Sequence, residues 1–226
     1  MTKRARLVML VLVVAAAGTT AAFLVPRSEP APDRGPVIAR VDGSPIYLAD
    51  ARSRVEGIVS IHGNVGEALG EDWPETILQT LVDDVIVRRE AERRDIGPDD
   101  REIQANVDEV RADFPSDDAF ATWLAEQGMD LLELERRVEL NLLATKVYVA
   151  VTEDVTVTGT AIRTYYDRHR TDYDTGDRVV PLLEVRAEIR GSLRQRKEDE
   201  AYARWLEEQR EAVDVSVVLD DWWRRA

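Results

Sequence analysis

The sequence contains no cysteine among its 226 residues. Disulfides, thiolate nucleophiles, cysteine–zinc sites and lipid-modified cysteines are therefore all excluded. Aromatic residues are also scarce, at 6% of the chain, although five of them are tryptophan, and there are only two histidines. The lack of disulfides leaves the compartment open, because an exported protein with a sufficient core folds without them.

Basic residues are outnumbered, with 30 Lys and Arg against 44 Asp and Glu and a net charge of −14. This balance argues against nucleic-acid binding, which needs a basic face to displace counterions. It also argues against adsorption on an anionic lipid surface. With 44% hydrophobic and 33% charged residues, the composition is globular and sufficient for one sizeable core or two small ones.

Residues 7–25 contain no charged side chain and directly follow Lys3, Arg4 and Arg6. A helix over this run would be about 28 Å long at about 1.5 Å per residue, close to the roughly 30 Å of a bilayer core. We therefore expect a signal anchor, with a cleaved signal peptide and a buried helix as the alternatives. Residues 26–36 then have the composition of a linker. The rest of the chain is expected outside the cytoplasm, anchored in the cell membrane by a single N-terminal helix.

The remaining chain is predicted to be a mainly α, multi-helix domain over residues 37–219. A β-branched run at 37–41, followed by the turn residues Asp42 and Gly43, predicts a strand, and the alternation at 213–219 predicts another. We expect these two strands to pair, which joins the N- and C-terminal segments in a small two-stranded β pairing. Residues 220–226 are expected to form a tail.

Between these strands, the apolar spacing predicts successive helices. A first helix is expected near residues 49–61, and the glycines at 63, 66 and 70 predict a loop. Gly97 and Pro98 are expected to end the helix that begins near Trp73, and residues 99–102 have the spacing of a capping box. Pro181 suits the first turn of the last long helix.

Several segments together resemble extracytoplasmic chaperones of the SurA and PrsA type, whose core fold is shared with trigger factor. Residues 41–46 (VDGSPI) resemble the opening strand and turn of that family, and residues 78–87 (LQTLVDDVIV) its second helix. Residues 120–129 (FATWLAEQGM) are similar to a further helical corner. Residues 162–167 (IRTYYD) and 185–190 (VRAEIR) resemble the entry to and exit from its isomerase domain.

The resemblance covers roughly residues 37–219 and includes one informative departure. Active family members carry a parvulin isomerase domain of about a hundred residues at the point where this chain has only residues 174–180. The resemblance therefore implies a peptide-binding module without the isomerase insert, and hence no catalytic residues and no cofactor.

Five apolar residues are the candidates for peptide contact, because aromatic side chains and methionine form surfaces that accept varied partners. They are Trp73, Phe114, Phe120, Trp123 and Met129. The competing interpretation is that they pack the small helices together, which the periodicity alone would predict. For Trp222 and Trp223, seating on the domain and contact with a partner or lipid remain equally open.

Other polar residues give no catalytic or metal-binding pattern. His62 and His169 have no local partners that would make either a general base. Acidic pairs such as Asp99–Asp100 and Asp117–Asp118 suit helix starts, where carboxylates complement the helix dipole. No metal site is expected.

The sequence thus predicts a chaperone that binds unfolded or nascent exported polypeptides without catalysis. Two other interpretations remain open. One is a dedicated protein–protein interaction subunit of a membrane complex, and the other is a degenerate peptidyl-prolyl isomerase. Clients and oligomeric state are not predicted.

Overall fold

The computed structural model describes residues 34–176 and 178–226. The predicted membrane or signal segment at 7–25, and most of the linker, lie outside these residues. No helix within the described ranges is both long enough and apolar enough to cross a membrane.

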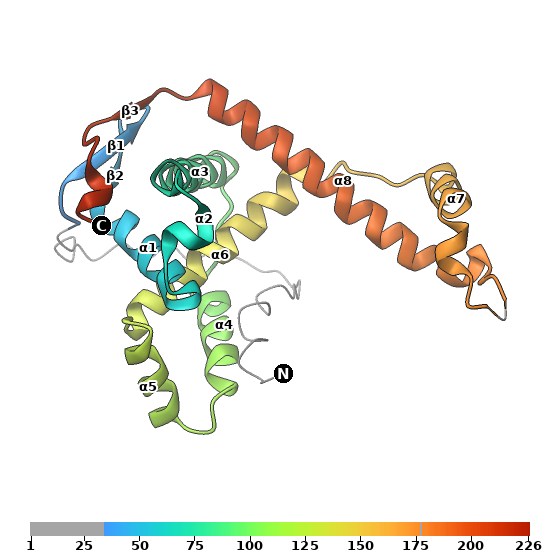
Figure 1. Cartoon of the computed structure of the whole chain (residues 1–226), viewed down its shortest axis with the longest axis horizontal. Helices are drawn as coiled ribbons and strands as arrows, with labels where there is room; N and C mark the ends of the chain where they lie inside the picture. The colour runs from blue at the N-terminus through green and yellow to red at the C-terminus, as the bar shows by residue number, and fades with distance from the viewer. Residues whose placement is uncertain (1–33, 177) are drawn as a thin grey trace.

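A small antiparallel sheet joins the two ends of the described chain (Figure 1). It consists of β1 (Val37–Val41), β2 (Ser44–Tyr47) and β3 (Val215–Val217), in the order β2-β1-β3. The predicted pairing of the terminal segments is confirmed, since Arg40 lies opposite Ser216. The prediction of only two strands is wrong, because the chain reverses immediately after β1 and adds β2.

The reversal depends on the two residues between β1 and β2. Asp42 and Gly43 both have positive φ angles, 43° and 85°, as two-residue hairpin turns with the twist of the flanking strands require. Pro45 is tolerated in β2 because this strand lies at the edge of the sheet, where a missing N–H removes no ladder hydrogen bond.

Two helices, α1 (Leu48–His62) and α3 (Trp73–Arg94), pack against the sheet. Ile38, Ile46, Ile77 and Ile86 are among the residues of this main core. The last strand is further held by Asp42, which accepts a hydrogen bond from the backbone N–H of Asp214 at 2.7 Å and pairs with an arginine of α3, Arg89.

Two local predictions in this region are corrected. The stretch containing Gly63, Gly66 and Gly70 includes a short helix, α2 (Val65–Leu69), because the Asn64 side chain accepts a hydrogen bond from the backbone of Glu67. The helix from Trp73 ends at Arg94 rather than at Gly97. Asp95 takes the left-handed conformation, with φ 56°, that terminates it.

Three helices form a second packed unit, which we call the α4–α6 lobe (residues 99–142). They are α4 (Asp100–Ala112), α5 (Asp117–Glu126) and α6 (Leu131–Thr152). The predicted capping box is confirmed, with the Asp99 and Glu102 side chains each bonding the other's backbone N–H. The lobe has its own small core around Val107, and the later part of α6 packs against α3 through Val147.

The chain then forms α7 (Gly159–Arg168), the 3-10 helix η2 (Arg170–Tyr173) and α8 (Leu182–Ala212). With its 31 residues, α8 is about 46 Å long at about 1.5 Å per residue. Its beginning packs on α7, its middle and end lie along α6 and α3, and it leads into β3. In Figure 1, α7 and the start of α8 project to the right of the sheet, and the α4–α6 lobe projects downward.

The C-terminal residues are part of the main core. Trp222, in the 3-10 helix η3 (Trp222–Arg224), is 3% exposed, and its ring meets that of Trp73 edge-on at 6.0 Å. Trp223 is 39% exposed. The predicted tail at 220–226 therefore seats one tryptophan on the domain and leaves its neighbour at the surface.

Candidate functional site

The structure brings together four of the five residues predicted to contact peptides. Phe114, Phe120, Trp123 and Met129 all belong to the α4–α6 lobe. The centroids of the Phe114 and Trp123 rings are 5.1 Å apart, and those of Phe114 and Phe120 are 5.5 Å apart. Phe120 is buried, whereas the other three are only half-buried. The aromatic cluster of the lobe is therefore only partly shielded from solvent.

The fifth predicted residue, Trp73, lies elsewhere. It begins α3 and packs against the main core beside Trp222. Its contact with a buried tryptophan gives it a structural role in joining the C-terminal segment to the domain.

Two exposed leucines also belong to the lobe. Leu131 and Leu132, at the start of α6, are 37% and 53% exposed. Leu132 and Ile103 line a shallow hollow of about 320 Å³ between α4 and α6, whose other lining residues are polar or charged. The start of α6 is fixed by Glu133, which accepts hydrogen bonds from Ser53 of α1 and from Arg137. Two apolar side chains therefore line this hollow among five polar or charged residues.

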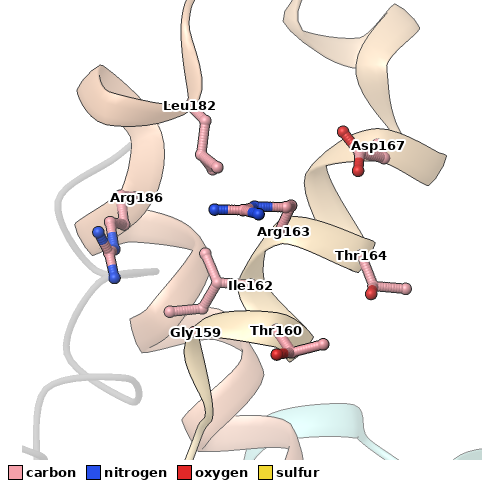
Figure 2. Close-up of a pocket in the computed structure, with 8 residues that line it drawn as sticks. All are labelled: Gly159, Thr160, Ile162, Arg163, Thr164, Asp167, Leu182 and Arg186. Atoms are coloured by element: carbon pink, nitrogen blue, oxygen red, sulfur yellow. The ribbon is translucent and has the colours of Figure 1, made fainter.

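A second pocket, of about 390 Å³, lies between α7 and the start of α8 (Figure 2). Its lining residues are Gly159, Thr160, Ile162, Arg163, Thr164, Asp167, Leu182 and Arg186. Figure 2 shows the Arg163 side chain extending from α7 toward α8, between Leu182 and Ile162. Arg163 and Arg186 are not among the site residues predicted from the sequence. Twenty-three positions separate them, and only the packing of α7 on α8 brings them to one pocket.

The short segment between α7 and α8 forms a closed turn. Asp174 and Val179 form an isolated antiparallel bridge, and the Tyr166 hydroxyl donates to the Val180 carbonyl at 2.7 Å. Arg178 makes a bidentate ion pair with Glu184 of α8. These contacts hold α7 against α8 at the position where the sequence resemblance places an isomerase insertion.

Neither histidine lies in an arrangement typical of a catalytic base. His169 ends α7, with its ring stacked on Tyr165 and Nδ1 within 2.8 Å of the Tyr165 carbonyl oxygen. His62 is exposed at the last residue of α1. Within residues 34–176 and 178–226, no group of three or more potential metal ligands is found.

Shifted pKa values mark contacts between helices. Burial, together with a hydrogen bond to Asp199 of α8, raises the pKa of Tyr148 on α6 to about 12. Burial likewise raises the pKa of Asp84 on α3, although Arg54 of α1 lies 2.7 Å away and acts in the opposite direction. Both side chains lie at contacts between neighbouring helices, and this packing accounts for their pKa shifts.

The residues that the structure describes thus form a small helical module with a partly exposed apolar cluster and a charged pocket. The sequence model of the SurA-like N-terminal domain family matches residues 1–148. Because this match covers more than half of the chain, the chain belongs to that family.

A curated protein is also similar to this chain. The chain is similar to the protein named "Foldase protein PrsA" of Clostridium acetobutylicum, with 27% identity over 145 residues. The aligned region is 60% of this chain and 44% of the relative. The chain thus matches less than half of that relative's length. The family match ends before α7, so the α7–α8 unit lies beyond it.

Proposed function

We propose that this protein is an extracytoplasmic chaperone that binds unfolded or nascent exported polypeptides without catalysis. Membership of the SurA-like N-terminal domain family, and similarity to a protein named a foldase, support a role in protein folding. Residues 7–25 provide the proposed signal or membrane anchor, which would keep the module close to emerging chains and raise its local concentration there.

The observation that carries this proposal is the incompletely buried apolar surface of the α4–α6 lobe. Phe114, Trp123 and Met129 are half-buried. Leu131 and Leu132, shortly after Met129 in the chain, are exposed. Methionine adapts to different partners because its side chain is flexible and polarizable, and aromatic rings contribute a large apolar contact area. Such a surface suits brief binding of unfolded segments with varied sequences.

The proposal that no catalysis takes place depends on the turn between α7 and α8. Residues 174–176 and 178–180 belong to the hydrogen-bonded turn described above, at the point where the resemblance places the isomerase domain. A proline cis/trans assay on a short peptide tests this directly. We expect the spontaneous rate in the presence of the chain, and an accelerated rate would contradict this part of the proposal.

The main experiment measures whether the purified full chain delays the aggregation of a chemically unfolded client, followed by light scattering. Replacing Leu131 and Leu132 together by serine removes apolar surface roughly equivalent to one leucine. Burial of one leucine contributes about 1.5–3 kcal/mol, so client affinity should fall by about tenfold or more. The delay should shorten accordingly.

Leu183→Ser is the matched control, because Leu183 is 83% exposed but lies at the start of α8, outside the lobe. We expect it to leave the delay unchanged. An equal loss in this variant would show that the lobe is not the client surface. Failure of the unaltered chain both to delay aggregation and to bind an unfolded peptide would refute the chaperone function.

A further inference from the structure

The α7–α8 arm (residues 157–197) differs in charge from the rest of this acidic chain. Its inner boundary is marked by Lys197 of α8, whose Nζ donates to the Thr156 carbonyl at 3.4 Å. The arm contains nine Lys and Arg residues but only six Asp and Glu residues, whereas the whole chain has a net charge of −14. An acidic segment of another polypeptide would therefore be repelled by most of this protein but not by the arm.

The pocket of the arm contains two arginines without a counter-ion. Across the described parts of the chain, the side chains of Arg163 and Arg186 form no hydrogen bond or ion pair. Other arginines do so repeatedly, for example Arg210 with Asp83 and Arg178 with Glu184. The one acidic lining residue, Asp167, is one turn from Arg163 on α7 but does not pair with it. The pocket therefore has two available guanidinium groups.

The remaining lining defines what the pocket would accept. Thr160 and Thr164 add hydroxyl groups to the lining, and the half-buried Leu182 adds an apolar side chain, which lies beside Arg163 in Figure 2. A guanidinium group presents parallel N–H donors whose geometry matches a carboxylate. An apolar side chain next to such donors suits a carboxylate attached to a hydrocarbon chain better than a free inorganic anion.

We infer that this pocket binds a carboxylate group of the client polypeptide, from either an acidic side chain or a chain terminus. The inference rests on the proposed chaperone function and adds a polar subsite to it. The apolar lobe would contact hydrophobic segments of a client, and the arm would select segments in which a carboxylate accompanies an apolar residue.

The test uses the full chain and three fluorescent, unstructured peptides of otherwise identical sequence. One has a central glutamate and an amidated C-terminus. The second has glutamine at that position and is amidated. The third has glutamine and a free C-terminal carboxylate. We expect the glutamate peptide, the free-terminus peptide, or both to bind about tenfold more tightly than the neutral peptide, as one added charge-assisted contact provides.

Two variants, Arg163→Gln and Arg186→Gln, should each abolish this preference while leaving the weaker binding of the neutral peptide unchanged. Arg168→Gln is the matched control, because Arg168 is an exposed arginine of the same helix that does not line the pocket. It removes the same charge and should preserve the preference. Circular dichroism of all variants checks that the arm remains folded.

Equal binding of all three peptides would overturn the pocket inference while leaving the chaperone proposal intact. The same conclusion follows if Arg168→Gln weakens the preference as strongly as the pocket variants, since the effect would then be general electrostatic attraction. Absence of binding by every peptide, together with no delay of client aggregation, would overturn both proposals.

Discussion

Replacing Trp222 by alanine should destabilise the protein far more than its position near the C-terminus suggests. The side chain is 3% exposed and belongs to the same core as Ile38 of β1 and Ile77 of α3. A buried tryptophan removes about 200 Å² from water, worth about 5 kcal/mol at about 25 cal/mol per Å². Since alanine retains a small part of this burial, we expect a loss of about 4 kcal/mol, within the usual range for such substitutions.

The neighbouring tryptophan provides the control. Trp223 is 39% exposed, and Trp223→Ala should cost less than about 1 kcal/mol, as is usual for surface positions. Urea unfolding followed by far-ultraviolet circular dichroism is the appropriate assay, because removing a tryptophan alters the fluorescence signal. The conclusion that the C-terminal segment belongs to the core would be refuted if Trp222→Ala lowered the free energy of unfolding by less than about 1 kcal/mol. This holds provided that the dependence of that free energy on urea concentration is unchanged.

Two further predictions concern contacts that close the structure. The pKa of Asp42 is lowered by its hydrogen bond from the backbone N–H of Asp214 and by Arg89. The stabilising effect of the Asp42 carboxylate is therefore complete above its ordinary pKa of 3.8 and is lost as the pH falls through the lowered pKa. In urea unfolding, the stability difference between the unaltered chain and Asp42→Asn should be present at neutral pH and vanish in that acidic range, and a difference independent of pH would contradict this. Tyr166→Phe removes the hydrogen bond to the Val180 carbonyl, which should cost about 1 kcal/mol of stability. Hydrogen exchange should become faster in residues 173–180 but not in the sheet. Unchanged exchange in residues 173–180 would show that this bond does not hold the turn.

The pairing of the terminal strands was predictable because it follows from local patterns. Both strand segments are rich in β-branched residues, and the backbone groups of each require a partner. The third strand was missed because residues 44–47 contain a proline and lead directly into a helix, which hides a four-residue edge strand. Helix ends with side-chain caps, such as Asp99 with Glu102, were also predictable because capping depends on adjacent residues.

The distribution of contacts between separate helices was not predictable from the same patterns. Periodicity identified Phe114, Phe120 and Trp123 as apolar face residues, but it does not tell which face is fully covered. The burial of Trp222 and exposure of Trp223 depend on a tertiary contact with Trp73, for which two consecutive tryptophans carry no local signal. Likewise, Arg163 and Arg186 line one pocket only because α7 folds back on α8.

The position of β3 has a consequence for how this protein matures. Its partner, β1, is made about 170 residues earlier, so the central strand stays open on one side throughout most of synthesis. The helices between them make mainly local contacts and are free to form first, while the sheet must wait for a long-range closure that is intrinsically slow. During synthesis, the chain therefore passes through a stage that resembles a client. At this stage one edge of β1 is unpaired, and the place in the main core that Trp222 later occupies is empty.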